Sequence, residues 1–216
     1  MRFVSLDTET TGLEPRLGHR IVEIGLVEVC DRSATGRSWH HYLNPERDIP
    51  AESSAIHGIT QDKVKDAPLF ADVFDSMMDF IGNSTVVIHN APFDLGFLDA
   101  ECLRLKVESP QNFSSRLSKV VDTLDMAKKM FPGSRKSLDA LCDRFEISRK
   151  ARVYHGALLD AQLLADVYLN MTRGQSNLMI DSQSQAKQQG ALTHARIQTV
   201  RYASEQELSW HHAYFS

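Results

Sequence analysis

The sequence predicts an α/β domain, in which helices flank a mixed five-stranded sheet, followed by a flexible C-terminal tail. Three β-rich stretches come first, at 2–6, 21–30 and 37–43, and turn-forming residues within 31–36 separate the last two. We therefore expect a three-stranded antiparallel unit at the start of the chain. From residue 73 onward, short apolar strands alternate with helical patterns, which is typical of a sheet covered on both faces.

The second half of the domain is expected to consist of alternating strands and helices. Apolar residues recur at helical spacing over 73–81, and residues 85–88 form a short apolar run that suits a buried strand. The remaining expected elements are helix 94–106, a brief strand at 120–121, a helix ending at Met130 before Pro132-Gly133, helix 137–145 and helix 156–172. Together these elements make a domain of ordinary size.

Composition and charge exclude several classes of protein. Of 216 residues, 42% are hydrophobic, which is enough for a sizeable core, and the formal net charge is −4. This charge argues against a protein that grips nucleic acid by bulk electrostatics, so a nucleic-acid substrate would need bound cations at its phosphates. Cys30, Cys102 and Cys142 are expected to be buried core thiols without disulfides. The absence of a signal peptide and of a long apolar run predicts a cytoplasmic protein without membrane contacts.

Asp7 and Glu9 stand at the end of the first expected strand, ahead of a turn at Gly12. If the strand continues through them, their side chains share one face, because alternate strand residues point the same way. Two adjacent carboxylates repel each other and persist only when they are solvated, protonated or bridged by cations. A pair of exposed acids at a strand end is the simpler alternative.

Asp94, His155 and Asp160 lie near the ends of other expected elements. Asp94 opens the helix after strand 85–88, where it is either an N-cap or a site residue at the carboxyl end of a strand. Asp160 shares a helical stripe with the apolar Leu163, and a carboxylate on a core-facing stripe is costly unless it is paired or metal-bound. His155 precedes that helix and is either a surface residue or a base beside Asp160.

Four carboxylates and one histidine at element ends suit the hydrolysis of a phosphodiester bond assisted by two divalent metal ions. Two cations roughly 3.5–4 Å apart can stabilise the attacking and the leaving oxygen. Carboxylates supply the oxygen ligands that Mg²⁺ and Mn²⁺ prefer, and a neutral histidine can remove a proton from the attacking water. We therefore expect two divalent ions, Mg²⁺ or Mn²⁺, as cofactors.

Three sequence motifs contain these five residues. They read Asp-Thr-Glu-Thr-Thr-Gly-Leu at 7–13, His-Asn-Ala-Pro-Phe-Asp-Leu-Gly-Phe-Leu at 89–98 and His-Gly-Ala-Leu-Leu-Asp-Ala at 155–161. In order and spacing they resemble the DEDDh exonuclease superfamily, which implies a ribonuclease H-like fold and metal-dependent 3′→5′ exonuclease activity. The resemblance implies metal binding by Asp7, Glu9, Asp94 and Asp160, with Asp7 bridging both ions, and general-base catalysis by His155.

Further motifs narrow the resemblance. Ile-Val-Glu-Ile-Gly at 21–25, Ile-His-Gly-Ile at 56–59 and two stretches within 129–142 are similar to the proofreading subunits of bacterial DNA polymerase III, and the likeness covers about residues 1–175. It implies a DNA 3′ end as substrate. The residues that would bind this substrate are Asp7, Glu9, Glu52, His57 and Asp160. By residue chemistry alone, Glu52 is a surface acid and His57 a turn residue.

The composition changes beyond an exonuclease domain at 1–172. Residues 173–190 hold five glutamines and little apolar content, which predicts a flexible linker, whereas 191–216 regain apolar side chains but are too few for a core. By resemblance, 175–180 is a peptide that binds the sliding clamp, and 191–216 bind the alpha subunit of DNA polymerase III. The alternative for 175–180 is a plain linker, and the presence of a small theta-like subunit stays open.

Two other functions stay open from the sequence. A stand-alone exonuclease that trims RNA or repairs DNA would need the same five residues but has little use for the linker and tail. A catalytically inactive scaffold that only braces a polymerase is the alternative from a different class. The intact set of catalytic residues argues against the scaffold.

Overall fold

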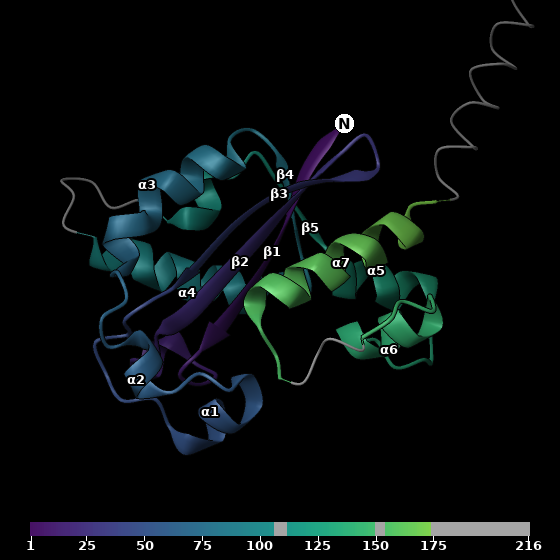
Figure 1. Cartoon of the computed structure of the whole chain (residues 1–216). Coiled ribbons are helices and arrows are strands. Elements are labelled where there is room, and N and C mark those ends of the chain that lie inside the picture. Colours follow the sequence, from purple (N-terminus) through teal and green to yellow (C-terminus); the bar gives the residue numbers. More distant parts are fainter. Residues whose placement is uncertain (106–111, 150–153, 174–216) are drawn as a thin grey trace, which may run out of the picture. The chain divides into compact units, whose positions relative to one another are not determined.

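The computed structural model describes residues 1–105, 112–149 and 154–173, within one compact unit, Met1–Arg173 (Figure 1). The strands are β1 Arg2–Thr10, β2 Ile21–Cys30, β3 Ser33–Tyr42, β4 Thr85–Ile88 and β5 Lys119–Asp122. The α-helices are α1 Ala51–His57, α2 Gln61–Val64, α3 Phe70–Ile81, α4 Ala91–Arg104, α5 Thr123–Met130, α6 Leu138–Arg144 and α7 Ala157–Met171. Two 3₁₀ turns, η1 Pro15–Leu17 and η2 Phe113–Arg116, complete this part of the chain. The predicted clamp-binding peptide 175–180 and the tail 191–216 lie outside the described residues.

The strands form one mixed sheet in the order β3-β2-β1-β4-β5. β2 pairs antiparallel with both β1 and β3, whereas β4 runs parallel to β1 and to β5. This arrangement confirms the predicted five-stranded mixed sheet with an antiparallel unit at its start. Because β1, β4 and β5 are parallel, their carboxyl ends meet at one edge of the sheet.

The hairpin between β2 and β3 is tighter than expected. β3 begins at Ser33, four residues earlier than expected, because Asp31 and Arg32 alone make the turn. Both residues have positive φ, 48° and 65°, as two-residue hairpin turns require. Cys30 ends β2 and is partly exposed, with its sulfur 3.7 Å from the Asp31 carboxylate. The expectation of three buried thiols is therefore wrong at Cys30, which lies at a strand end, and right for the other two cysteines.

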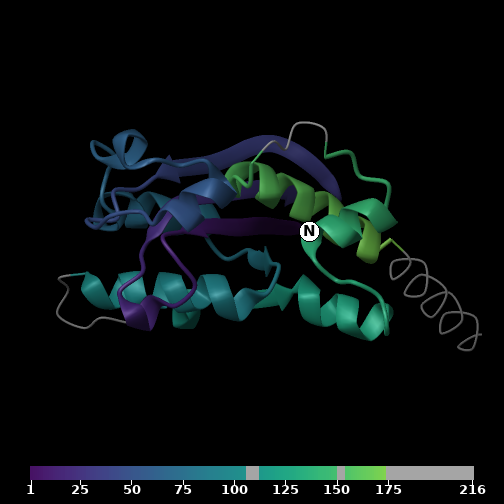
Figure 2. The ribbon, with the colours of Figure 1, turned by 90° about the horizontal axis from the view of Figure 1, so that it is seen from below.

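Helices cover both faces of the sheet, and Figure 2 shows β1 running between α7 and α4. Val4 and Leu6 belong to the core cluster that includes residues of α3 and α4, whereas Phe3 packs with α7, its ring 4.9 Å from that of Tyr168. Alternate residues of β1 thus face opposite helical layers. By the same alternation, the side chains after Phe3 at positions 5, 7 and 9 point toward α7.

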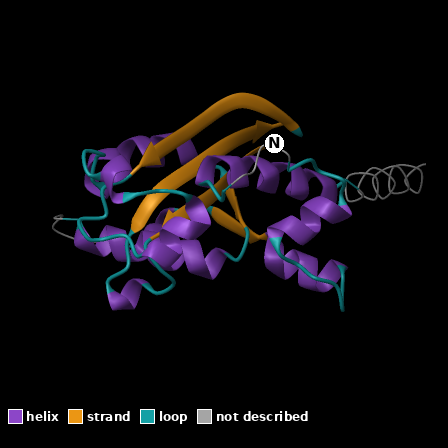
Figure 3. Cartoon of the chain, turned by 60° about the horizontal axis from the view of Figure 1, so that its bottom comes forward, coloured by secondary structure: helices purple, strands orange, loops and turns teal. Residues whose placement is uncertain are grey.

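The secondary structure differs from the expectation at two further places (Figure 3). The short helices α1 and α2 follow β3, in a region whose sequence lacks helical apolar periodicity. Helix α4 begins at Ala91, three residues before the expected start, because Asn90 adopts a left-handed conformation with φ 70° and Pro92 suits the first helical turn. In the described part of the chain, no helix is long and apolar enough to cross a membrane.

Candidate active site

Asp7 and Glu9 both lie within β1, since the strand extends to Thr10. The condition for a shared face is therefore met, and both side chains point toward the layer that contains α7. In the register with β2, Asp7 lies opposite Gly25 and Glu9 lies opposite Glu23. The predicted acidic pair thus stands on the central strand, at the edge where the parallel strands end.

Helix α7 approaches β1 and β2 closely at this edge. A Cβ atom on Gly25 would lie 2.4 Å from the carbonyl carbon of Ala157 and from the nitrogen of Leu158, so only glycine permits the approach. The Ser5 hydroxyl also donates a hydrogen bond to the Ala161 carbonyl at 2.7 Å. Because Gly25 lies opposite Asp7, this packing brings the first turn of α7 next to the acidic pair.

Glu9, His155 and Asp160 form a group in which one ligand atom of each lies within 4.8 Å of the others. His155 Nδ1 lies 3.4 Å from Asp160 Oδ2, and Asp160 is only 3% exposed. The backbone nitrogen of His155 donates to the Ile56 carbonyl at 3.2 Å, which fixes the segment before α7 against α1. Two carboxylates and an imidazole are suitable donors for a divalent cation, so the residues present fit such an ion.

Asp94 lies on the other face of the sheet from the group of Glu9, His155 and Asp160. The Thr8 hydroxyl donates to Asp94 Oδ1 at 2.8 Å, and the carboxyl group is buried. Burial raises its pKa to about 7, although the hydrogen bond from Thr8 opposes the shift. The N-cap alternative is wrong, since Asn90 occupies that position and Asp94 lies in the first turn of α4. Among the described residues, the group within 4.8 Å includes neither Asp94 nor Asp7, so their roles as ligands stay a prediction.

Glu52 and His57 both lie on α1, beside the segment that carries His155. Glu52 is exposed and lines a pocket of about 440 Å³ together with Gly12, Leu13 and other residues of the β1–β2 connection. His57 is buried, and its Nδ1 accepts a hydrogen bond from the Ile59 nitrogen at 3.0 Å. Burial lowers the pKa of His57 below its usual value, partly offset by the Thr10 backbone. His57 is therefore neutral at pH 7, with its proton on Nε2.

Glu23 is a functional candidate that the sequence analysis missed. Its carboxylate is 3% exposed, and its Oε1 lies 2.6 Å from His40 Nε2. Its Oε2 accepts a hydrogen bond from the Ala157 nitrogen at 3.1 Å, which anchors the start of α7 three residues before Asp160. The available signal was an acid within the apolar run Ile-Val-Glu-Ile-Gly. Burying its charge there is costly without a partner, as it is for Asp160 on its apolar stripe.

Asp122 is a second missed residue, at the carboxyl end of β5. Its two oxygens accept hydrogen bonds from the nitrogens of Asn90, at 3.0 Å, and of Ala91, at 3.1 Å. It also caps α5 through the Leu124 nitrogen at 2.8 Å. Asp122 therefore fixes the turn from which α4 presents Asp94. The signal was a short apolar strand that ends in an acid, although sequence alone does not reveal which backbone the acid holds.

The sequence matches the exonuclease family, also described as RNase_T, over residues 4–168. The chain belongs to this family. It is 47% identical to DNA polymerase III subunit epsilon of Salmonella typhimurium, over 97% of this chain and 90% of that protein. Its identity to the epsilon subunit of Escherichia coli K12 is 45%, over 98% of this chain and 91% of that protein. Its identity to the epsilon subunit of Rickettsia felis is 50%, over 82% of this chain and 76% of that protein.

Solved structures agree with the family. Exonuclease X in complex with 5′-overhanging duplex DNA is similar with a TM-score of 0.62 and 28% identity, over 79% of this chain and 91% of that one. The nuclease domain of 3′hExo, a DEDDh family member bound to rAMP, is similar in fold with a TM-score of 0.68, at 20% identity over 80% and 92%.

These similarities confirm the predicted ribonuclease H-like fold and the predicted metal-dependent 3′→5′ exonuclease. The resemblance to the proofreading subunits is confirmed as well. Exonucleases of this superfamily depend on divalent metal, which agrees with the donor atoms of Glu9, His155 and Asp160.

Proposed function

We propose that the chain is the cytoplasmic proofreading 3′→5′ exonuclease of a replicative DNA polymerase, and that it hydrolyses the 3′-terminal phosphodiester of DNA. The observation that carries this proposal is the group Glu9, His155 and Asp160, which lies at the end of the central strand next to Asp7. The identity of 45–50% to epsilon subunits of DNA polymerase III supports the choice of replication over RNA trimming.

In the proposed mechanism, Asp7, Glu9, Asp94 and Asp160 hold two Mg²⁺ or Mn²⁺ ions. When bound, these ions stabilise negative charge on the attacking and the leaving oxygen. His155 accepts a proton from the attacking water, with its Nδ1 oriented by Asp160 at 3.4 Å. Water adds to the terminal phosphorus, the bond to the 3′ oxygen of the preceding nucleotide breaks, and a deoxynucleoside 5′-monophosphate leaves.

The terminal nucleotide is proposed to bind between β1 and α1. Glu52 lines the pocket of about 440 Å³, and His57 offers a neutral ring on the same short helix. Together with Asp7, Glu9 and Asp160, these two residues would contact the nucleotide near its 3′-hydroxyl. Frayed or mispaired ends are preferred in this proposal, because an unpaired terminus costs less free energy to lift into the site.

The partners are proposed from the relatives and from composition. The alignment with the Salmonella subunit covers 97% of this chain, so it extends well beyond Arg173. This extension supports binding of the polymerase alpha subunit by 191–216 and of the sliding clamp by 175–180. A net charge of −4 favours weak affinity for DNA alone, and tethering to the polymerase would supply a high effective concentration instead.

The deciding experiment compares 3′-labelled DNA duplexes with paired and mispaired termini, together with an RNA of the same sequence, at saturating Mg²⁺. We expect faster release of the terminal nucleotide from mispaired DNA than from paired DNA or RNA. Preference for RNA would contradict the proposal in favour of a trimming enzyme. Unchanged nucleotide release by Asp7→Ala would contradict the site assignment. A companion pull-down compares the full chain with a truncation after Thr172, and only the full chain should retain the polymerase.

A further inference from the structure

The negative charge of the chain is unevenly distributed. Residues 128–149 carry six cationic and three acidic side chains, a net charge of +3 in a chain whose total is −4. They comprise the end of α5, the connection to α6, and α6 with the residues that follow it. Nucleic acids bind proteins largely through their phosphates. A local excess of cationic side chains near the active site is therefore typical of a surface that binds a nucleic-acid strand.

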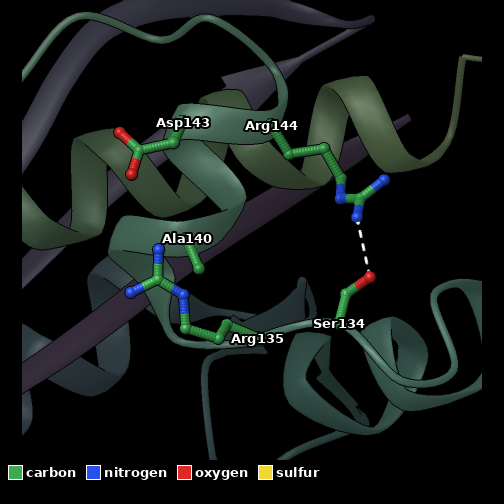
Figure 4. Close-up of a pocket in the computed structure, with 5 residues that line it drawn as sticks. All are labelled: Ser134, Arg135, Ala140, Asp143 and Arg144. Atoms are coloured by element: carbon green, nitrogen blue, oxygen red, sulfur yellow. Dashed lines mark hydrogen bonds between the residues drawn. The ribbon is translucent and has the colours of Figure 1, made fainter.

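Part of this cationic excess surrounds a pocket of about 480 Å³. Its lining residues are Ser134, Arg135, Ala140, Asp143 and Arg144. In Figure 4 the guanidinium groups of Arg135 and Arg144 extend to opposite sides of Ala140. Arg144 donates a hydrogen bond to the Ser134 hydroxyl at 2.9 Å and lies over the Phe131 ring at 4.3 Å. These contacts with neutral groups orient the guanidinium without neutralising it.

The acids near the pocket already have cationic partners. Arg149 forms ion pairs with Asp139, at 3.1 Å, and with Asp143. Lys128 likewise pairs with Asp125 at 2.8 Å. Within the described ranges, no ion pair involves Arg135, Lys136 or Arg144. Lys136 instead donates to the Ser134 carbonyl at 2.6 Å. The pocket therefore has two exposed guanidinium groups, those of Arg135 and Arg144, whose charges are available to an anion, and the ammonium group of Lys136 lies next to Arg135 in the chain.

The pocket borders the same edge of the sheet as the active site. The His89 ring follows β4, lies 2.9 Å from the Thr123 hydroxyl and bonds to the Lys136 backbone. His89 is five residues before Asp94. On the other side, Leu141 of α6 packs in one core cluster with Leu164 of α7, the helix that carries Asp160. The segment that lines the pocket thus contacts the residue that follows β4, and helix α6 packs against α7, which carries Asp160.

We propose that this pocket binds phosphate groups of the DNA strand whose 3′ end occupies the active site, with Arg135 and Arg144 as the principal contacts. The proposal rests on the proposed function for its substrate class. Arginine suits this task because its planar guanidinium donates two parallel hydrogen bonds to phosphate oxygens and stays charged at every physiological pH. The pocket gives an acidic chain a local means to hold a strand, with few contacts and therefore modest affinity.

The test is equilibrium binding of a 5′-fluorescein-labelled oligothymidylate to the full-length chain, followed by anisotropy in EDTA so that no hydrolysis occurs. The variant Arg135→Gln/Arg144→Gln should bind roughly 10-fold more weakly at low salt. Its plot of log affinity against log salt should be shallower by about 0.7 for each cation removed, the value for a single strand. Lys119→Gln, at the opposite end of β5, is the matched control and should bind like the unaltered chain.

Three outcomes would overturn the proposal. An unchanged affinity and salt slope would exclude the pocket from strand binding. Weaker binding with an unchanged salt slope would show that the variant damages the fold, and Arg135→Lys/Arg144→Lys, which keeps the charges, should then bind no better. If DNA binding is unchanged but the polymerase no longer co-purifies, the surface binds protein instead.

A chain-length comparison separates this proposal from the proposed function. We expect kcat/KM of the double variant for a 12-nucleotide DNA, divided by its value for the p-nitrophenyl ester of thymidine 5′-monophosphate, to fall by roughly 10-fold. An equal loss on both substrates would contradict a role on the strand. If the unaltered chain hydrolyses neither substrate, the proposed function fails, whereas the anisotropy measurement still decides whether the pocket binds phosphate.

Discussion

At the amino end of β1, Arg2 donates a hydrogen bond from Nε to the buried carboxylate of Glu28 at 2.6 Å, and Arg37 adds a second cationic contact at 3.1 Å. At the carboxyl end of the same strand, the buried carboxyl group of Asp94 accepts a hydrogen bond from the Thr8 hydroxyl, and Asp160 Oδ2 lies 3.4 Å from His155 Nδ1. The pKa of Glu28 is lowered, mainly by Arg2, whereas burial raises that of Asp94 to about 7. Both side chains are nearly inaccessible to solvent, but Asp94 is enclosed more deeply than Glu28, and the two pKa values shift in opposite directions.

The difference lies in the source of the positive charge. The chain supplies arginine at the structural end, so the acid there contributes to folding. At the other end, the described ion pairs include no cationic side chain for Asp94, so burial keeps its carboxyl group costly to ionise. Burial alone therefore does not identify an acid as part of a functional site. The kind of partner that the acid has is the more informative observation.

The strongest test of this difference between the two ends of β1 is to neutralise one acid at the end that carries the active site. Asp160→Asn should lower kcat on the order of 10³-fold, because one donor of charge stabilisation in the transition state is lost. Its midpoint of thermal unfolding in EDTA should not fall, since a buried charge is removed. Steady-state hydrolysis of a 3′-labelled oligonucleotide and calorimetry measure the two effects. Activity within 10-fold of the unaltered chain would refute the role of Asp160.

The reciprocal substitution is at the structural end. Glu28→Gln should lower the free energy of unfolding by about 2 kcal/mol, since hydrogen bonds from Arg2 and Arg37 to a charged acceptor are weakened. Its kcat should equal that of the unaltered chain, because Glu28 lies on β2 opposite Val4, at the end of β1 away from Asp7 and Glu9. Urea unfolding measured by circular dichroism gives the stability. A loss of activity without a loss of stability would invalidate the division between the two ends.

Glu23 is intermediate, since it is a buried acid with His40 as its partner that also supports the site. Glu23→Gln weakens the acceptor that holds the Ala157 nitrogen, so the apparent affinity for Mn²⁺ should fall by roughly 10-fold. Isothermal titration with Mn²⁺ measures this directly. Saturating Mn²⁺ should restore kcat, which distinguishes positioning from participation. Lower stability with unchanged Mn²⁺ affinity would make Glu23 purely structural.

The last expected effect is on how the stability of the metal-free protein depends on pH. The folded state keeps a proton on Asp94 up to a pKa of about 7, whereas the unfolded chain loses it near 3.8. The stability from this proton is complete below pH 4 and is lost as pH rises toward 7. Asp94→Asn should therefore flatten the fall in unfolding free energy between these pH values, because asparagine does not titrate.

The opposite sign applies to Glu28, whose lowered pKa gives stability at neutral pH that is lost as pH falls below its unfolded value. Denaturation in EDTA at several pH values for Asp94→Asn, Glu28→Gln and the unaltered chain separates the two contributions. The same sign of change for both variants would contradict the comparison.

Much of this could be read from the sequence, because the decisive signals are local. The strand that bears Asp7 and Glu9 and the helix that bears Asp160 follow from apolar patterns of period 2 and 3.6. The beginning of β3 could not be predicted, because Arg32 also adopts the left-handed conformation, which aspartate tolerates but arginine does not favour by type. Helix α1, with Glu52, has too few apolar residues to show a period.

Contacts between distant segments were beyond a single sequence. Glu23 meets His40 and the Ala157 nitrogen only through the register of β2 with β3 and the approach of α7. Asp94 faces Thr8 rather than the group of Glu9, because α4 covers the opposite face of the sheet from α7. Such relations follow from topology, which residue patterns indicate only in outline.

The absence of a side chain at Gly25 has a consequence for heredity. One added methyl group would push against the backbone of Ala157 and Leu158 and displace the helix that carries Asp160. Every acid and the histidine would still be present, and polymerisation would continue. If the chain proofreads, a cell with Gly25→Ala would copy its genome at normal speed and pass more errors to each generation.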